Sequence, residues 1–306
     1  MLPPIDTHQI LNLRTAGAVV DPTAPPAVVT EQEPDENGVI KQATTVFLIG
    51  KECPFRCLMC DLWKHTTSEP TPPGALVRQL SQVLPQIQHR EIIKLYNASN
   101  FFDPQSVPLT DRNGLATLVQ DFETVVIENH PKLLSNKVPE FAARLNGQLQ
   151  VAMGLETADE RILRWLNKQM TVADYERACE FLIKHGITIR TFLLLPAPGV
   201  ESTDALSHTV SSVRKALDCG SRVTSLIPLR AGNGVMDWLL NERLVHLPDL
   251  SSVANTFASA LKLRREKQQR IFLDLWNIET LATTEKHADD LRKQLHRWNM
   301  EQPTST

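Results

Sequence analysis

Six short runs of apolar and β-branched residues alternate with helical patterns between residues 44 and 229, and this alternation limits the fold more than any other feature of the sequence. The run at 187–195 ends in Phe-Leu-Leu-Leu, and such near-continuous apolar character is typical of a strand covered on both faces. Strands that alternate with helices in this way indicate an α/β fold with a parallel sheet. The expected strands lie at 44–49, 91–96, 124–127, 149–155, 187–195 and 223–229.

The clearest helical pattern lies at 171–185, where apolar residues recur at helical spacing along one stripe. Thr171 can cap this helix and Gly186 can end it. Similar patterns at 76–84 and 206–217 place helices between other pairs of expected strands. Repeated strand–helix units with right-handed crossovers either close into a barrel or open into a doubly wound sheet, and periodicity leaves both outcomes open.

We expect three parts along the chain of 306 residues. Residues 1–42 are rich in proline and show little periodicity, which indicates an irregular arm. The strand–helix units occupy 43–235, and helical patterns dominate 236–306, which predicts a helical C-terminal extension. The apolar segment 271–276 interrupts this extension and could form one more strand. The helices expected in the extension lie at 236–244, 250–270 and 284–298.

The composition is that of an ordinary globular protein, with 42% hydrophobic residues, 22% charged residues and a formal net charge of −3. This charge gives no overall sign of nucleic-acid binding. The N-terminus lacks a basic segment followed by an apolar one, and no run reaches the ~18 apolar residues of a membrane span. Five cysteines in a chain of this length do not suggest a disulfide framework. We therefore predict a cytoplasmic protein in a reducing compartment.

A CxxxCxxC motif follows the first expected strand directly and brings together Cys53, Cys57 and Cys60. Structural zinc takes four protein ligands, whereas a [4Fe-4S] cluster held by three cysteines leaves one iron free for chemistry. His65 could complete a zinc site, but zinc-binding pairs normally come with a second, distant pair, which the sequence lacks. We therefore expect the three cysteines to be ligands of an iron–sulfur cluster.

The CxxxCxxC loop between a strand and a helix resembles the signature of the radical S-adenosylmethionine (SAM) superfamily. The resemblance implies a partial (β/α)6 barrel in which the three cysteines ligate a [4Fe-4S] cluster and SAM chelates the fourth iron. It also implies reductive cleavage of SAM to methionine and a 5′-deoxyadenosyl radical, with electrons from a reductant protein such as a flavodoxin or ferredoxin. The alternative is a non-catalytic scaffold that binds an iron–sulfur cluster or zinc and interacts with a partner.

By this resemblance, SAM contacts come from the carboxyl ends of the barrel strands. The glycine-rich turn of the superfamily is replaced here by 96–103, which has no glycine but offers polar acceptors for the SAM ammonium group. Glu156 matches the acidic residue that meets the SAM ribose, and a helix N-cap or surface acid is the alternative. Lys168 and Arg190 compete for the SAM carboxylate, and either could instead form a structural ion pair.

Apolar groups at the ends of the fifth and sixth expected strands, with Met59 from the cysteine motif, match the positions that line the adenine. A core-packing role is the alternative for all of them. The complete set of expected cofactor-binding residues is Met59, Asn97, Ser99, Asn100, Glu156, Thr157, Lys168, Arg190, Leu195, Pro196 and Pro228.

Short strings at 154–160, 166–168 and 186–195 look like the core shared with the catalytic subunit of Elongator. More loosely, 99–103 and 127–131 are similar to the radical SAM subunit of archaeosine synthase. If so, the implied reaction is a radical step on a modified tRNA nucleobase or an amino-acid adduct of one. A small-molecule substrate is the alternative.

Cations in the C-terminal extension would support a tRNA substrate, but interspersed acids such as Glu266 and Asp290 favour an ordinary solvated helix face. No catalytic residue can be named beyond the cluster ligands. Tyr96, Glu128 and His130, near strand ends, are candidates for substrate contact, whereas the isolated Cys179 and Cys219 are interpreted as core thiols. The cations concerned are Lys262, Arg264, Arg265, Lys267, Arg270, Arg292, Lys293 and Arg297.

Overall fold

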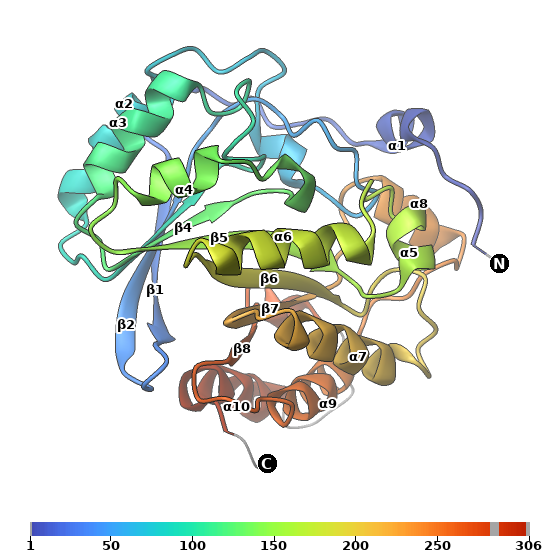
Figure 1. The fold of residues 1–306 in the computed structure, drawn as a ribbon. Coiled ribbons are helices and arrows are strands. Elements are labelled where there is room, and N and C mark those ends of the chain that lie inside the picture. The colour runs from blue at the N-terminus through green and yellow to red at the C-terminus, as the bar shows by residue number, and fades with distance from the viewer. Residues whose placement is uncertain (1, 282–287, 304–306) are drawn as a thin grey trace.

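The protein is an α/β half-barrel in a computed structural model that describes residues 2–281 and 288–303. Eight strands form one sheet whose spatial order follows the chain order, β1 to β8, and the sheet curls as Figure 1 shows. A doubly wound sheet reverses its strand order at a switch point, and no reversal occurs here. The strands are β1 (Ala27–Pro34), β2 (Ile40–Phe47), β3 (Ile92–Tyr96), β4 (Thr124–Glu128), β5 (Gln148–Glu156), β6 (Thr188–Leu195), β7 (Val223–Pro228) and β8 (Arg270–Leu273).

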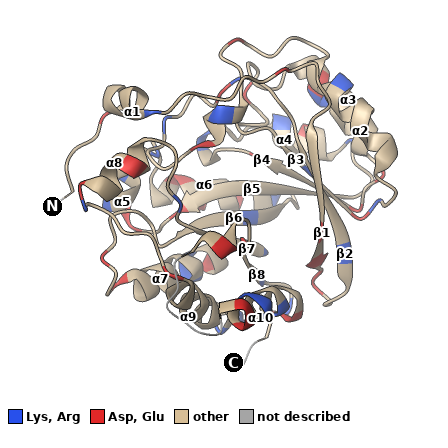
Figure 2. Ribbon diagram, turned by 180° about the vertical axis from the view of Figure 1, so that it is seen from behind, with Lys and Arg blue, Asp and Glu red and all other residues tan. Residues whose placement is uncertain are grey.

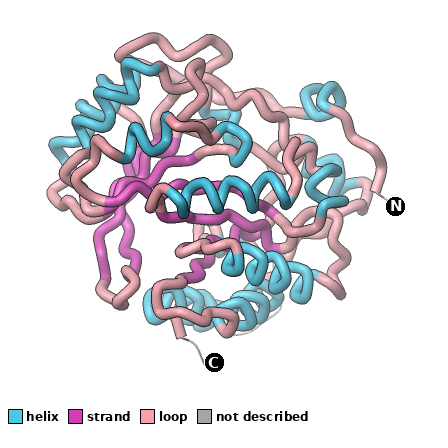
Figure 3. The backbone as a smooth tube through the Cα atoms, viewed as in Figure 1, coloured by secondary structure: helices cyan, strands magenta, loops and turns pink. Residues whose placement is uncertain are grey.

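The strands from β2 to β8 are parallel, and helices cover their outer face (Figure 3). The described helices include none long and apolar enough to cross a membrane. The helices on the outer face are α2 (Ala75–Val83), α3 (Leu109–Val119), α4 (Lys137–Ala142), α6 (Val172–Lys184), α7 (Ala205–Asp218), α9 (Leu250–Leu261) and α10 (Ala288–Glu301).

Helix α6 forms where the sequence pattern predicts it, because its cap and its apolar stripe are both used. Thr171 caps it, because its hydroxyl accepts from the Asp174 N–H at 3.1 Å and the Asp174 carboxylate accepts from the Thr171 N–H at 2.9 Å. Tyr175, Cys179 and Leu182 of its apolar stripe are buried in the core, whereas Ile183 is 53% exposed. The six expected strands and the helices between them are confirmed.

The two faces of the sheet differ in polarity. Leu95, Ile127 and Val151 are paired across β3, β4 and β5 and lie in the core under the outer helices. Because successive side chains of a strand alternate, Lys94 and Gln150 point to the concave face instead. We call this concave face, with Lys94, Tyr96, Glu128, Gln150, Arg190 and Phe192, the lumen.

Three shorter helices lie together near the N-terminus (Figure 1). They are α1 (Thr7–Leu13), α5 (Glu160–Trp165) and α8 (Val235–Asn241), and they share a second apolar cluster with Leu58 of the cysteine loop. Short 3-10 turns occur at η1 (Leu62–His65), η2 (Leu84–Gln86), η3 (Pro131–Leu133) and η4 (Ile278–Thr280).

The N-terminal arm is more ordered than its proline content suggests, since it contains α1 and strand β1. Strand β1 pairs antiparallel with β2 over its whole length. In the extension, the possible extra strand at 271–276 is confirmed as β8. Helix α9 ends at Leu261, so the cations of 262–270 lie in the following turn and in β8. The helix expected from 284 is α10, and its expected first residues, 284–287, lie outside the described part of the chain.

Candidate active site

The cysteine loop follows β2 and lies at the carboxyl edge of the sheet, fixed by backbone and side-chain contacts from distant segments. The Leu58 N–H donates to the Leu166 carbonyl at 2.9 Å. Asn167 donates from its side-chain amide to the Arg56 carbonyl at 2.8 Å. Asn233 does the same to the carbonyls of Leu58, at 2.9 Å, and Cys60, at 3.2 Å. These contacts hold the loop in one conformation.

The three thiols lie in a buried environment. Burial raises the pKa of Cys53, and it raises the pKa of Cys57 to about 11 and of Cys60 to about 12. In residues 2–281 and 288–303, no three histidine, cysteine or acidic side chains converge closely enough to hold a single metal ion. One zinc ion requires such convergence, with sulfur at about 2.3 Å. A four-iron cluster binds each thiolate through a different iron, so three cysteines can hold it.

Asn100 links the cysteine loop to the strand ends. Its side-chain Nδ2 donates to Cys53 Sγ at 3.1 Å, and its Oδ1 accepts from the His130 N–H at 2.7 Å. We expect Asn100 to contact SAM, and in the structure its amide also contacts the thiol of Cys53, an expected cluster ligand. Hydrogen bonds to ligating sulfur atoms orient the ligand and tune a bound metal centre.

The turn after β3 adopts a glycine-like conformation without glycine, since Ala98 has a φ of 50°. Asn97 is fully buried and donates to Ser106 Oγ at 2.9 Å. However, Asn97 Oδ1 and Ser99 Oγ are buried and have no hydrogen-bond partner among the described residues. Such a group costs about 1–3 kcal/mol unless a ligand satisfies it. Two adjacent unsatisfied oxygens at this edge fit the ammonium group of SAM.

Glu156 and Lys168 form a buried ion pair, with Nζ 2.7 Å from Oε1. Glu156 has a φ of 65°, and the pairing of β5 with β6 is irregular between Gly154 and Glu156. Burial opposes the charge on Lys168, but Glu156 and Cys57 outweigh it, so the pKa of Lys168 lies above its usual value. Of the two cations expected at the SAM carboxylate, Lys168 is thus the one that the structure brings to the cysteines.

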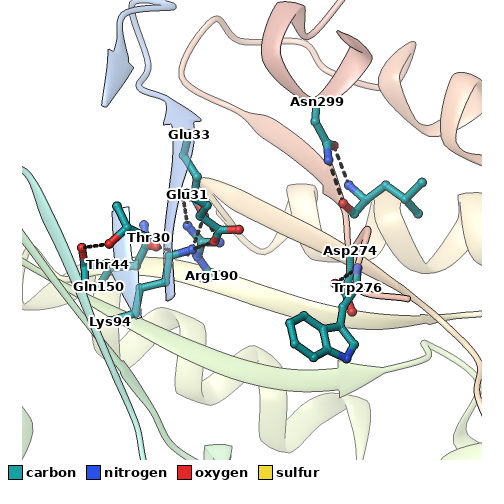
Figure 4. Close-up of polar contacts among 11 residues, drawn as sticks. Thr30, Glu31, Glu33, Thr44, Lys94, Gln150, Arg190, Asp274, Trp276 and Asn299 are labelled. Carbon is teal, nitrogen blue, oxygen red and sulfur yellow. Dashed lines mark hydrogen bonds and ion pairs between the residues drawn. The ribbon is translucent and has the colours of Figure 1, made fainter. Parts of the chain in front are cut away.

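Arg190 lies in the lumen in a different network (Figure 4). Its Nη2 is 2.6 Å from Glu33 Oε2, and its Nε donates to Gln150 Oε1 at 2.9 Å. Lys94 also pairs with Glu33, and with Glu31 at 2.6 Å. Burial alone would raise the pKa of Glu33, but Arg190 and Lys94 hold it well below its usual range. Arg190 therefore forms the structural ion pair that was its alternative role.

The residues expected around the adenine come from converging segments. Met59 packs against the second apolar cluster, with Leu194, Ala197 and Leu229. The Leu229 N–H donates to the Leu195 carbonyl at 2.9 Å, which joins the ends of β6 and β7. The remaining expected contacts, Pro196 and Pro228, stand at the same two strand ends.

Thr157 is fully buried directly after β5. Its hydroxyl lies 3.4 Å from His208 Nε2 and accepts from the Asp159 N–H at 3.1 Å. These contacts position the start of α5, so the structure gives Thr157 a structural role beside its expected cofactor contact.

His130 lies directly beneath the cysteine loop. Its ring stacks on Phe55 with centroids 3.9 Å apart. Its Nδ1 accepts from the Lys132 N–H at 3.2 Å, so Nε2 carries the proton and donates to the Lys168 carbonyl at 3.0 Å. Burial and the charge of Lys168 lower the pKa of His130 to about 3. This imidazole is therefore a neutral support of the loop.

Two site residues were not identified from the sequence. Asn233, only 2% exposed, holds the cysteine loop from the segment before α8. Its flanking glycines, Gly232 and Gly234, are the signal of a tight turn that could have pointed to it. Glu33 reaches the lumen from β1, and no local pattern marks it. Away from the site, the thiols of Cys179 and Cys219 contact each other, and Cys179 is buried in the core as expected.

Comparison with known proteins agrees with this geometry. The family model of the radical SAM superfamily matches residues 47–213. The beta subunit of archaeosine synthase from Methanosarcina acetivorans is 25% identical over 207 residues, which are 64% of this chain and 60% of that protein.

Two solved structures share the fold. A radical SAM methyltransferase from Sphaerobacter thermophilus superposes with a TM-score of 0.54 at 12% identity, over 83% of this chain and 78% of that one. Archaeal Elp3 from Methanocaldococcus infernus gives a TM-score of 0.50 at 13% identity, over 74% and 59% of the two chains. This chain thus spans about three fifths of the archaeosine synthase subunit and of Elp3. The family model covers more than half of its residues, so this chain belongs to the radical SAM superfamily.

Proposed function

We propose that this protein is an enzyme that binds a [4Fe-4S] cluster through Cys53, Cys57 and Cys60 and uses it to cleave SAM reductively. The observation that carries the proposal is the position of the cysteine loop at the carboxyl edge of the half-barrel. The turn after β3, at the same edge, holds two buried oxygen atoms that have no partner in the described part of the chain. When bound, the cluster and SAM supply a 5′-deoxyadenosyl radical for hydrogen abstraction.

The protein's own side chains bind SAM and orient it and the cluster. Asn100 fixes the thiolate of Cys53. Asn97 Oδ1 and Ser99 Oγ accept hydrogen bonds from the SAM ammonium group. Lys168 supplies a positive charge for the SAM carboxylate, while Glu156 holds this lysine in place and offers its second oxygen to the ribose. A reductant protein such as a flavodoxin or ferredoxin delivers the electron.

We infer that the substrate is a tRNA nucleobase. The resemblance of this chain to Elp3 and to the archaeosine synthase subunit supports this inference. The structure adds Trp276, which is 65% exposed directly after β8 at the carboxyl edge. An exposed aromatic ring there is suited to stack on a base.

A small-molecule substrate is the second candidate, because several C-terminal cations are already engaged by the protein. Arg265 pairs with Asp218 at 3.2 Å, and Arg292 pairs with Asp289 at 2.9 Å. Arg264 donates from Nε to the Gln269 carbonyl at 2.7 Å. Figure 2 shows acidic and basic residues interspersed on α10. This pattern matches a solvated helix face better than a phosphate-binding surface.

The test is anaerobic reconstitution with iron and sulfide, followed by SAM and a reductant. We expect four irons and four sulfides per chain and formation of 5′-deoxyadenosine. Cys57→Ala should lose both, whereas Cys219→Ala, a half-buried cysteine outside the loop, should retain both. One zinc without sulfide, or unchanged 5′-deoxyadenosine formation by Cys57→Ala, would contradict the proposal.

A further inference from the structure

A cavity of about 390 Å³ lies at the amino edge of the half-barrel, at the other end of the parallel strands from the cysteine loop. The segment that follows β1 contributes Asp35 and Glu36 to its lining. Pockets for small organic ligands have volumes of about 300–1,000 Å³, so this cavity is large enough to hold one. The first residues of five strands also line it, and these are Ile92, Thr124, Gln148, Thr188 and Arg270.

Among the residues that the structure describes, four cations line this amino-edge cavity. Three of the four each have a carboxylate partner close by, so their charges are balanced within the protein. The exception is Arg270. The three pairs are Lys41–Glu123 at 2.9 Å, Arg190–Glu33 at 2.6 Å and Arg222–Glu266 at 3.2 Å.

Arg270 lacks a close partner although its side chain is only 12% exposed. Within residues 2–281 and 288–303, its one ion pair is with Glu36, whose Oε2 lies 3.9 Å from Arg270 Nη1 and whose side chain is 54% exposed. The Nε of Arg270 is buried and finds no hydrogen-bond partner in the same ranges. A buried charge without compensation is strongly unfavourable, so this guanidinium needs an anion.

The neighbouring charges do not supply that anion. Burial and the positive charge of Arg190 lower the pKa of Arg270, whereas Glu33 outweighs burial and raises the pKa of Arg190. Asp35 is engaged in the turn after β1, where its Oδ1 accepts from the Asn37 N–H at 2.8 Å. Arg190 is therefore neutralised by the protein and Arg270 is not.

Gln150 provides a further donor to the same cavity. Its Oε1 accepts from Arg190 Nε at 2.9 Å, which orients the amide. The other end of the amide, Nε2, donates to no atom in the described part of the chain, although Gln150 is only 5% exposed. A guanidinium and an amide NH₂ group are both donors that match carboxylate or phosphate oxygens.

We propose that the amino-edge cavity binds a small organic anion whose carboxylate or phosphate group pairs with Arg270 and accepts from Gln150. The cysteine loop lies at the opposite edge of the sheet, so this ligand is distinct from SAM and from the substrate of the proposed reaction. The inference does not depend on the proposed function. Because the cavity lies between the segment after β1 and β8, the two outer strands of the sheet, the bound anion also stabilises the fold.

Four probes that share a benzene ring and differ in charge test the site. Phenyl phosphate and phthalate are anions, benzyl alcohol is neutral and benzylamine is a cation. Each is titrated into the full chain by calorimetry at fixed ionic strength, with SAM present. We expect one or both anions to bind at least tenfold more tightly than the other two probes, and the tighter anion identifies the ligand group as phosphate or carboxylate. Equal or tighter binding of benzyl alcohol or benzylamine, or no binding of either anion, overturns the proposal.

A matched pair of variants assigns the binding to Arg270. Arg270→Met removes the charge and the donors but keeps a side chain of similar length, so the tighter anion should bind at least tenfold more weakly. Arg265→Met makes the same change at a 70% exposed side chain outside the cavity lining and should leave the affinity unchanged. Unchanged affinity in Arg270→Met, or an equal loss in Arg265→Met, contradicts the site.

Thermal unfolding distinguishes a ligand-binding arginine from a structural one. Without the anion, Arg270→Met should have a Tm no lower than wild type, because it removes a buried charge that has no close partner. The tighter anion, added well above its Kd, should raise the Tm of wild type and leave that of Arg270→Met unchanged. A lower Tm of Arg270→Met without the anion, or equal shifts in the two proteins, overturns the proposal.

Discussion

Asn100 Nδ2 donates a hydrogen bond of 3.1 Å to Cys53 Sγ, while the other end of the same amide holds the His130 backbone. The contact joins the turn after β3 to the cysteine loop, so a strand end and a ligand of the proposed cluster share one hydrogen-bond network. A donor to a ligating sulfur stabilises the more reduced, more negative state of a cluster.

We therefore predict that Asn100→Ala makes the reduction potential of the reconstituted cluster more negative. Asn100→Asp should shift it further in the same direction, because it replaces the donor by a negative charge beside the thiolate. The potentials are measured by redox titration followed by electron paramagnetic resonance. Asn255→Ala, an exposed site on α9, is the control, and an unchanged potential in both Asn100 variants contradicts this role.

Gly154 is required by the close approach of the Glu156–Lys168 pair. A Cβ added at this position would lie 2.1 Å from Glu156 Oε1 and 2.7 Å from Lys168 Nζ. Gly154→Ala should therefore displace the ion pair, lower the free energy of unfolding by about 1–3 kcal/mol and weaken SAM binding. Urea denaturation and calorimetric titration of SAM measure the two effects.

Gly38→Ala is the control for Gly154→Ala, because it adds backbone strain without displacing the Glu156–Lys168 pair. Gly38 has a φ of 79°, and an added Cβ would meet no atom within 4 Å. This variant should lower stability by about 1–2 kcal/mol and leave the affinity for SAM unchanged. Equal SAM affinity in Gly154→Ala and wild type would show that the pair does not serve the cofactor.

Glu33 should be the main acidic determinant of stability in the lumen. Glu33→Gln leaves Arg190 and Lys94 without their shared carboxylate, which should cost about 3–5 kcal/mol near pH 7. The matched control is Glu31→Gln, because the Glu31 side chain is 52% exposed and its pair with Lys94 should contribute about 1 kcal/mol or less. Urea denaturation compares the two variants.

The same carboxylate gives stability a definite pH dependence. The pKa of Glu33 is depressed in the folded protein, so its contribution is complete above the unfolded value of about 4.3 and is lost as the pH falls from there towards the folded value. Glu33→Gln should therefore lose less stability than wild type when acidified through that range. Parallel acid profiles for the two proteins would exclude this assignment.

Strands that carry their own apolar pattern could be predicted from the sequence. Contacts between residues that lie far apart in the chain could not. The apolar runs that became β2 to β7 carry their own signal, because their outward residues pack under helices. Strand β1 lacks that signal, since its first six residues are exposed and only its end is buried. The need of Arg190 for an anionic partner was clear, but Glu33 lies 157 residues away from it.

In the candidate site, too, local features could be predicted from the sequence and long-range contacts could not. The cysteine motif is local, so the three ligands proposed for the cluster could be named from the sequence. Asn100 lies 47 residues from Cys53, so its hydrogen bond to that thiol could not be inferred from the sequence. Burial is likewise a property of the folded chain, so the raised pKa of Glu128 could not be inferred from its residue type.

Trp276 provides the sharpest test of an RNA substrate. Its backbone is fixed: its N–H donates to Asp274 Oδ1 at 3.0 Å, and its carbonyl accepts from Arg230 Nη2 at 2.5 Å. Arg230 Nη1 lies 2.9 Å from Asp274 Oδ2, so the three residues form one rigid unit after β8. The indole itself is 65% exposed at the edge that carries the cysteine loop.

We predict that Trp276→Ala weakens tRNA binding about fivefold or more, because stacking on one base contributes about 1–3 kcal/mol. Leu109→Ala, at a 62% exposed residue of α3, is the control for loss of exposed apolar surface and should leave the affinity unchanged. Filter binding at fixed salt measures both variants, since phosphate contacts depend strongly on ionic strength. If Trp276→Ala binds tRNA as wild type does, no base stacks on Trp276, and the small-molecule candidate is favoured.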